Sequence, residues 1–251
     1  VYDMAAYPKT LSGKTVAAYV NTHTDFSDEL YREGKLVSDN YKNILRSQTN
    51  AAAIPAEVTV RYGVTVRRAN LRNLPTGEGL FFYAGDRNFD ALQETALDPG
   101  EAVAILHTST NGYFYYVQAY NYRGWLSKFD VAETDRSTWL RYAEPKNFLT
   151  VVAKDYTLKA DGAQVLFQQG ARLQLADKKA SAYTVKVPVR TKEGKLQEEK
   201  VVLAANASLH EGYLPYTTNN IIRSAFKFYD SVYGWGGLQQ KKKKKTFPLS
   251  A

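Results

Sequence analysis

The sequence predicts an α+β protein that is mainly β. Short segments rich in β-branched residues alternate with glycine-containing turns through the middle of the chain, as in antiparallel sheets. Apolar residues recur at helical spacing near the two ends and in one linker. Hydrophobic residues make up 44% of the 251 residues, which is enough to bury a core. These observations together predict small β-barrels flanked by helices.

Residues 1–56 are predicted to form a helical N-terminal segment. Residues 26–31 favour one short helix. A second helix is indicated by apolar residues at roughly helical spacing, namely Leu36, Val37, Tyr41, Ile44 and Leu45. Residues 50–55 end this helix, because the residue before Pro55 is disfavoured in helical conformation.

Residues 57–142 are predicted to form a first small barrel. Residues 58–66 alternate β-branched and other residues, which indicates a strand. Asn111 and Gly112 are a strong hairpin signal between two later strands. The strands expected after the first lie at residues 102–106, 113–120 and 123–126. Residues 136–142 favour a short helical linker to the next block.

Residues 143–212 are predicted to form a second small barrel of similar architecture. A turn is expected at residues 192–195, where Gly194 follows a charged pair. The expected strands lie at residues 148–153, 165–167, 172–175, 183–189 and 201–203.

Residues 213–240 are predicted to contain one more helix, of three to four turns. Thr217 and Thr218 are its candidate N-caps. A glycine-rich turn at residues 234–237 ends it. Its apolar stripe predicts self-association, because the stripe has no partner elsewhere in the sequence pattern. The stripe consists of Ile221, Ile222, Ala225, Phe226 and Tyr229.

The net charge of the chain excludes few classes of binding partner. The formal net charge is +8, but five of the 33 basic residues form the run 241–245. Removing that run leaves 28 basic against 25 acidic residues, a net charge of +3. A mildly basic body suits anionic polymers of several kinds, including cell walls and nucleic acids. The lysine run and the rest of residues 241–251 are interpreted as a solvated tail.

Two features that the sequence lacks exclude some classes of function. No apolar run approaches the roughly 18–20 residues that a membrane-spanning helix needs. The chain contains no cysteine, so disulfides, thiolate metal sites and a cysteine nucleophile are excluded.

Three segments together resemble one family. The first is residues 62–76, and the second is residues 92–101 followed by residues 122–125. The third is residues 212–221 followed by Tyr233-x-Trp235-Gly236-Gly237. Their order and spacing resemble the NlpC-type cell-wall cysteine peptidases, in which a stabilising segment and two bacterial SH3 domains precede a papain-like catalytic domain. The two predicted barrels then correspond to the SH3 domains, and residues 213–240 to the first helix of the peptidase.

The resemblance implies a peptidase activity, but this chain lacks part of the catalytic residues that the activity needs. Such enzymes cleave the amide between γ-D-glutamate and the diamino acid of peptidoglycan stem peptides in the bacterial cell envelope. Their nucleophile lies in an Asp-Cys-Ser motif after the glycine pair, and a histidine follows downstream. Here residues 238–240 and the lysine run occupy that place. The chain is therefore expected to be catalytically incomplete and to need no cofactor or metal.

The resemblance also suggests individual site residues. Tyr233 would support the oxyanion in a complete enzyme. Glu94 and Tyr122 would bind the free amine of the stem peptide, because a carboxylate and a phenol suit an ammonium ion. Trp235 is a further substrate-facing candidate. The alternative for Glu94 and Tyr122 is an exposed loop carboxylate and a packed loop tyrosine, and for Tyr233 packing at a helix end.

Other polar residues favour structural roles. Arg68, Asn70 and Arg72 either form an anion site or, in the favoured interpretation, fix the turn at residues 74–76 and pack domains together. Trp125 is expected either in the core or in packing at the rim of the barrel. The three histidines lack metal-ligand spacing and are interpreted as structural. They are His23, His107 and His210.

Two rival functions remain open at this stage. One is a non-catalytic cell-wall-binding module, which predicts an exposed aromatic groove. The other is a basic barrel that binds nucleic acid, which the net charge of +3 outside the lysine run disfavours. We expect weak binding of stem peptides and no nucleic-acid partner.

The end of the chain carries a prediction of its own. The lysine run is encoded by an adenine-rich stretch, where reading-frame shifts are common. Reading residues 245–248 from the third base of the Lys245 codon permits Asp-Phe-Ser, one base from Asp-Cys-Ser. A frameshift origin is therefore predicted for the tail. Coincidence is the alternative, because free codon positions make such matches easy.

Overall fold

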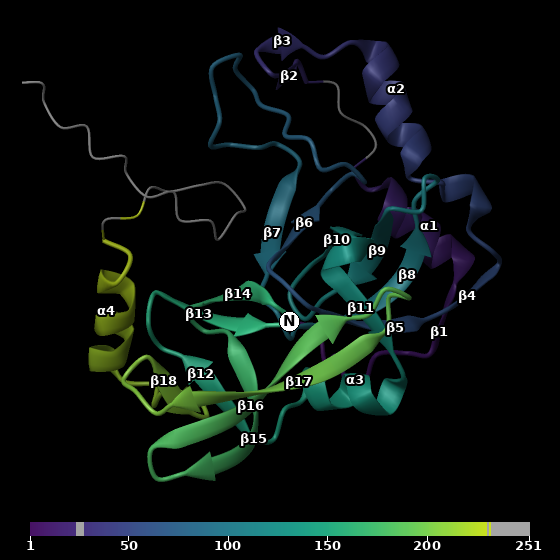
Figure 1. The fold of residues 1–251 in the computed structure, drawn as a ribbon. Coiled ribbons are helices and arrows are strands. Elements are labelled where there is room, and N and C mark those ends of the chain that lie inside the picture. The colour runs from purple at the N-terminus through teal and green to yellow at the C-terminus, as the bar shows by residue number, and fades with distance from the viewer. Residues whose placement is uncertain (24–27, 230, 232–251) are drawn as a thin grey trace, which may run out of the picture.

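The fold was obtained as a computed structural model and is described for residues 1–23, 28–229 and 231. It is mixed α+β and mainly β, as predicted, and its strand pairs are antiparallel. Figure 1 shows two β-rich halves, one built by residues 61–134 and the other by residues 148–211. Within the part of the chain described, no helix is long and apolar enough to cross a membrane.

The N-terminal segment holds a helix that the sequence analysis missed. Ser12 caps it by accepting a hydrogen bond from the backbone N–H of Thr15 at 3.1 Å. Gly13 is the first residue of the helix. Only glycine fits there, because a Cβ atom would lie 1.9 Å from the carbonyl oxygen of Pro55. The elements of this segment are β1 (Thr10–Ser12), α1 (Gly13–Asn21), β2 (Tyr31–Arg32), β3 (Lys35–Leu36), α2 (Asp39–Gln48) and η1 (Ala51–Ala53).

One of the two helices predicted in this segment is present. The helix expected at residues 26–31 is wrong in its described part, because Tyr31 opens the small hairpin of β2 and β3; residues 26 and 27 lie outside the described residues. The second helix is confirmed as α2. It begins at Asp39 because the Ser38 side chain caps it, so Leu36 precedes the helix.

The first β-rich half is a seven-stranded antiparallel sheet with the order β11-β5-β8-β9-β10-β6-β7. The single strand predicted at residues 58–66 is two strands, because β4 pairs with β1 of the N-terminal segment and β5 pairs with β8 and β11. The hairpin turn predicted at Asn111 and Gly112 is confirmed, with Gly112 at φ +70°. The seven strands of the sheet are β5 (Arg61–Thr65), β6 (Ala69–Arg72), β7 (Gln93–Leu97), β8 (Ala102–Thr108), β9 (Phe114–Gln118), β10 (Arg123–Ser127) and β11 (Val131–Thr134), and β4 (Glu57–Thr59) lies outside it.

The second β-rich half contains a five-stranded sheet with the order β17-β16-β15-β12-β18 and a separate β13–β14 hairpin. The predicted turn at residues 192–195 is confirmed by Gly194 at φ +85° between the long strands β16 and β17. Closure of either sheet into a barrel stays a prediction. The strands are β12 (Phe148–Val151), β13 (Asp155–Ala160), β14 (Ala163–Gln168), β15 (Arg172–Lys179), β16 (Ala182–Arg190), β17 (Leu196–Ala204) and β18 (Leu209–Glu211).

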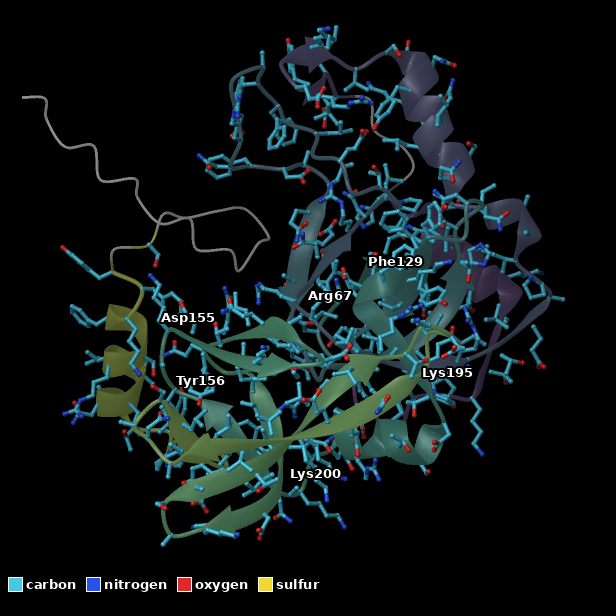
Figure 2. The ribbon with its side chains drawn as sticks, in the orientation of Figure 1. Arg67, Phe129, Asp155, Tyr156, Lys195 and Lys200 are labelled. Carbon is cyan, nitrogen blue, oxygen red and sulfur yellow. The ribbon has the colours of Figure 1, made fainter. Side chains whose placement is uncertain are left out.

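Each half has its own core, and the helical linker joins them. The predicted linker helix is confirmed as α3 (Arg136–Ala143). Its Trp139 is fully buried and donates its indole N–H to the carbonyl of Val103 at 3.0 Å. Tyr142 donates to the carboxylate of Glu198 in the second half at 3.1 Å. In Figure 2, Arg67 and Phe129 lie on the first half, whereas Tyr156 and Lys200 lie on the second.

The two halves are also joined at a second place, outside α3, by a buried pair of charged side chains. Arg68 donates to Asp98 at 2.9 Å, and the same carboxylate oxygen accepts the backbone N–H of Gln168, at the end of β14, at 3.0 Å. Arg172 reaches back to Glu101 at 3.3 Å. Burial raises the pKa of Asp98, and Arg68 and the Gln168 N–H oppose this shift. The prediction that Arg68 packs domains together is confirmed.

The last helix, α4 (Thr218–Phe226), begins where predicted but is shorter. The Thr217 side chain caps it by accepting the backbone N–H of Asn220 at 3.3 Å. Nine residues make about two and a half turns rather than three to four. Its apolar side chains are exposed, and self-association through them stays a prediction. They are Ile221, Ile222, Ala225 and Phe226.

We predict that Asp98→Ala destabilises the protein by about 3 kcal/mol, because it leaves the Arg68 guanidinium buried without its anion. Urea unfolding followed by tryptophan fluorescence measures the change. Asp177→Ala, at an exposed position of β15, is the matched control and should leave the midpoint unchanged. Equal midpoints for the two variants would show that the Arg68–Asp98 group contributes nothing.

Candidate functional site

Glu94 and Tyr122 lie together, as the resemblance suggested. Glu94 is in β7, and Tyr122 is in the turn between β9 and β10. The Glu94 carboxylate is the largest cause of the raised pKa of Tyr122, because a negative acceptor beside the hydroxyl favours the protonated phenol. The alternative of an exposed loop carboxylate does not hold, because Glu94 is a strand residue whose side chain is only 17% exposed.

The turn that carries Tyr122 is fixed by hydrogen bonds from the hairpin beneath it. The backbone N–H of Ala119 donates to the carbonyl of Tyr122 at 2.8 Å. The buried amide of Gln118 donates to the same carbonyl at 3.1 Å and to the carbonyl of Ala119 at 2.7 Å. These hydrogen bonds fix the backbone of the turn from which the Tyr122 side chain projects.

A third side chain, His23, reaches Glu94 from the N-terminal segment. It lies just beyond the end of α1, and its Nε2 atom is 3.8 Å from Oε1 of Glu94. The imidazole is 40% exposed, whereas the carboxylate side chain is 17% exposed. Sequence analysis interpreted His23 as structural and did not connect it with the site. No sequence signal could have done so, because 70 residues separate it from β7.

A pocket of about 250 Å³ opens beside this group. Arg123 forms part of its wall, with its guanidinium carbon 3.7 Å from the ring centroid of Tyr19. The same guanidinium donates to the hydroxyl of Tyr2 at 3.0 Å. The pocket is therefore mainly aromatic and polar, with a fixed cation in its wall, and Glu94 adjoins it through the lining residues His23 and Tyr122. Its lining residues are Tyr2, Tyr19, Thr22, His23, Tyr116, Asn121, Tyr122 and Arg123.

The tyrosines behind the pocket are neutral at physiological pH. Burial raises the pKa of Tyr116 well above its usual range and that of Tyr7 to about 12. Tyr116 donates to the carbonyl of Tyr19 in α1 at 2.9 Å. Its ring packs edge-on against Trp125, which is fully buried, as the core alternative predicted. The back wall is thus rigid and contributes no negative charge that would compete with Glu94.

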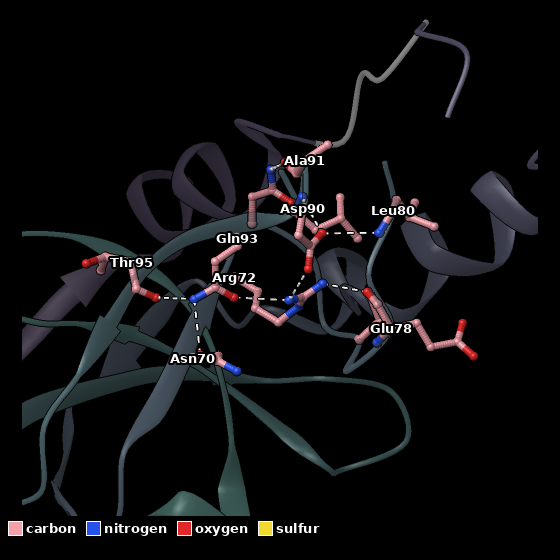
Figure 3. A network of polar contacts seen from close by, with 11 residues as sticks. Asn70, Arg72, Glu78, Leu80, Asp90, Ala91, Gln93 and Thr95 are labelled. Atoms are coloured by element: carbon pink, nitrogen blue, oxygen red, sulfur yellow. Dashed lines mark hydrogen bonds and ion pairs between the residues drawn. The ribbon is translucent and has the colours of Figure 1, made fainter. Parts of the chain in front are cut away.

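Arg72 fixes the long loop that precedes β7, whereas the favoured interpretation had assigned it to the turn at residues 74–76 (Figure 3). Its guanidinium donates to Asp90 at 2.8 Å and to Gln93 at 3.1 Å, and it also binds the carbonyl of Glu78. Gln93 in turn donates to the side chain of Asn70 at 3.3 Å. The network therefore positions the residue that immediately precedes Glu94.

The anion-site alternative for these residues is not supported. Arg68 and Arg72 are each paired with a different carboxylate, Asp98 and Asp90 respectively. Both guanidinium groups are largely buried, with 10% and 6% of their side chains exposed. They do not converge on one pocket.

The other two histidines lie away from the pocket. Nε2 of His107 is 3.0 Å from the carbonyl oxygen of Asn50, and burial lowers the pKa of this imidazole. Nδ1 of His210 is 3.4 Å from the carbonyl oxygen of Gly212. The described residues contain no group of three or more carboxylate or imidazole side chains that could hold a metal ion. Tyr233 and Trp235 lie outside the described residues.

Two further hollows are larger, and neither contains a residue that the resemblance suggested. One, of about 540 Å³, lies between the β2–β3 hairpin and the loop before β7, and includes Arg32, Glu78 and Arg87. The other, of about 400 Å³, lies between α3 and β15 and includes Lys146 and Lys186. The loop before β7 also exposes Phe82, Tyr83 and Phe89, the kind of aromatic surface that the wall-binding alternative predicted.

Comparison with known protein families identifies one domain within the chain. Residues 80–127 match the SH3 domain family of the SH3b1 type. This range contains both Glu94 and Tyr122. Comparison with curated proteins gives no match.

One solved structure has a similar fold over most of the chain. It was reported as "a novel NlpC/P60 Endopeptidase from Photobacterium damselae subsp. piscicida", and it matches with a TM-score of 0.65 and 22% sequence identity. The match covers 89% of this chain and 50% of that one. The present chain therefore spans about half the length of that structure. The predicted resemblance is supported at the level of an SH3b domain and of the fold.

We predict that Glu94→Gln lowers the pKa of the Tyr122 hydroxyl, because a neutral amide stabilises the protonated phenol less than a carboxylate does. NMR titration of ¹³C-labelled tyrosine measures the shift. The control is Tyr115, whose hydroxyl donates to Glu133 at 2.8 Å and whose pKa should not change. An unchanged Tyr122 titration would show that the two side chains do not interact.

Proposed function

We propose that this chain is the accessory, SH3-like region of a peptidoglycan stem-peptide endopeptidase and that it binds the free amino end of the stem peptide. In this proposal residues 1–56 are a stabilising segment, residues 57–142 and 143–212 are two SH3-like barrels, and residues 213–240 correspond to the start of the papain-like domain. Residues 241–251 form a basic tail. The SH3b1 match and the similar fold of the NlpC/P60 endopeptidase support this assignment and a location in the bacterial cell envelope.

The observation that carries the proposal is the Glu94–Tyr122 pair beside an aromatic pocket. Glu94 raises the pKa of Tyr122, so the two side chains act on each other, and both a carboxylate and a phenol carry oxygen lone pairs that accept hydrogen bonds. A primary ammonium group has three donors and no acceptor, and hydrogen bonds between ionised partners are about twice as strong as neutral ones. The pair therefore suits the α-ammonium group at the end of a peptide.

The rest of the pocket sets the direction of the ligand. Arg123 keeps a positive charge on the far wall through its contacts with Tyr19 and Tyr2. Like charges repel, so an ammonium ion is directed away from Arg123 and toward Glu94. The tyrosine rings can cover a small side chain such as the methyl group of alanine, the first residue of a stem peptide.

Catalysis is assigned to no residue of this chain. Hydrolysis by the route that the resemblance implies needs a thiolate, and the sequence contains no cysteine. The residues that line the pocket all lie between positions 2 and 123, so the pocket is complete without any peptidase domain. This observation favours the second candidate function, a non-catalytic cell-wall-binding module, which shares the same ligand.

We predict that the full chain binds L-alanyl-γ-D-glutamate and that Glu94→Gln and Tyr122→Phe each weaken binding by about tenfold or more, which corresponds to the loss of a charged hydrogen bond. Isothermal titration calorimetry measures the affinities. Glu211→Gln is the matched control, because Tyr183 donates to Glu211 at 3.1 Å in a similar pair outside the pocket.

The same experiment has a ligand control. N-acetylation removes the ammonium group, so the acetylated dipeptide should not bind. Equal affinity for the free and acetylated dipeptides, or an unchanged affinity of both site variants, would contradict the assignment of Glu94 and Tyr122.

We predict that the chain does not hydrolyse tri- and tetrapeptide muropeptides. Mass spectrometry after prolonged incubation should detect no L-alanyl-γ-D-glutamate above a buffer blank, whereas an active NlpC/P60 endopeptidase under the same conditions releases it. Release by this chain would require a nucleophile other than cysteine and would overturn the assignment of the chain as catalytically incomplete.

A further inference from the structure

We propose that His23 is an internal competitor for Glu94, which weakens the binding of an ammonium ligand when the imidazole becomes protonated. The inference rests on the proposed function, because it concerns the same carboxylate. It adds a regulatory role for a residue of the N-terminal segment, and it makes peptide binding sensitive to the pH of the surroundings.

The geometry places His23 where a ligand cation would have to stand. Its Nε2 atom is 3.8 Å from Oε1 of Glu94, a distance that allows a direct ion pair with imidazolium. The imidazole is also part of the wall of the pocket beside Tyr122. A protonated His23 would therefore both neutralise the carboxylate and repel an incoming ammonium group.

The other groups around Glu94 hold their charge between pH 5 and 8. Tyr122, from the turn between β9 and β10, and Tyr116, from β9, both have raised pKa values. Tyr7, from the N-terminal segment, has a pKa of about 12. Arg123, from β10, is a guanidinium group that stays charged. Imidazole is the side chain whose charge ordinarily changes in this range, and His23 is the imidazole that lies beside Glu94.

The direction of the effect follows from linkage. While the imidazole is uncharged, Glu94 is free to receive the ammonium group of the ligand. Imidazolium, in contrast, must be separated from Glu94 before the ligand can pair with it. Binding and protonation therefore oppose each other, and by reciprocity the ligand expels a proton from His23 when it binds.

The test is the affinity of the full chain for L-alanyl-γ-D-glutamate between pH 5.5 and 7.0. Carboxylates ordinarily titrate below this window and the ligand amine above it. Affinity of the unsubstituted protein should fall about two- to fivefold toward pH 5.5, as expected for a partly exposed ion pair. His23→Gln should bind equally well across the window. His210→Gln, a matched histidine substitution outside the pocket, should follow the unsubstituted protein.

A second readout tests the linkage directly. Calorimetry at pH 6.0 in two buffers of different ionisation enthalpy should show proton release on binding to the unsubstituted protein and none for His23→Gln. A pH profile of His23→Gln that falls as steeply as that of the unsubstituted protein overturns the inference alone. Absence of binding by the unsubstituted protein at pH 7.0 overturns the proposed function, and the inference with it.

Discussion

The candidate site depends on the packing of α1 against the hairpin of β9 and β10. Val16 and Val20 on one face of α1 enter the same buried cluster as Tyr116 and Trp125 of the hairpin. This burial is the main stabilising term at the junction, at about 1.5–3 kcal/mol for each large apolar side chain. It also places the end of α1 beside β7. Without it, His23 and Tyr19 would have no reason to lie near Glu94.

Two polar networks position the other half of the site. The Arg72 network holds the loop before β7, so that Glu94 follows a residue whose side chain is already fixed by three hydrogen bonds. The Arg68–Asp98 pair anchors the other end of β7 to the second β-rich half through the N–H of Gln168. The carboxylate thus sits in a strand restrained at both ends, which is the preorganisation that ligand binding benefits from.

Much of the fold could be predicted from local sequence signals, because those signals act over a few residues. Alternation and the Asn111-Gly112 turn located the β8–β9 hairpin, and a threonine N-cap located the start of α4. The sequence-based predictions were wrong where pairing between residues far apart in the sequence determines the secondary structure. Residues 58–66 have the pattern of one strand, but they form two. The first, β4, pairs with β1, and the second, β5, pairs with β8 in the seven-stranded sheet. The helix α1 was missed although Ser12 is a favourable N-cap before Val16 and Val20.

The candidate site was predictable only in part. Glu94 and Tyr122 were suggested by the resemblance, and the structure brings them together. Neither His23 nor Arg123 could be assigned from the sequence, because their positions follow from how α1 packs and how β10 leaves its turn. A structural role for Arg72 was predicted, but its partners Asp90 and Gln93 were not, because they follow it by 18 and 21 residues across the long loop.

The central claim is that the ammonium group of a stem peptide lies against Glu94 and Tyr122. The most direct measurement is the set of intermolecular NOEs between L-alanyl-γ-D-glutamate and the isotope-labelled full chain. The account predicts contacts from the alanine methyl group to the ring protons of Tyr122 and Tyr19. Contacts at saturation to Phe81, in the 540 Å³ hollow, with none to Tyr122, would contradict it.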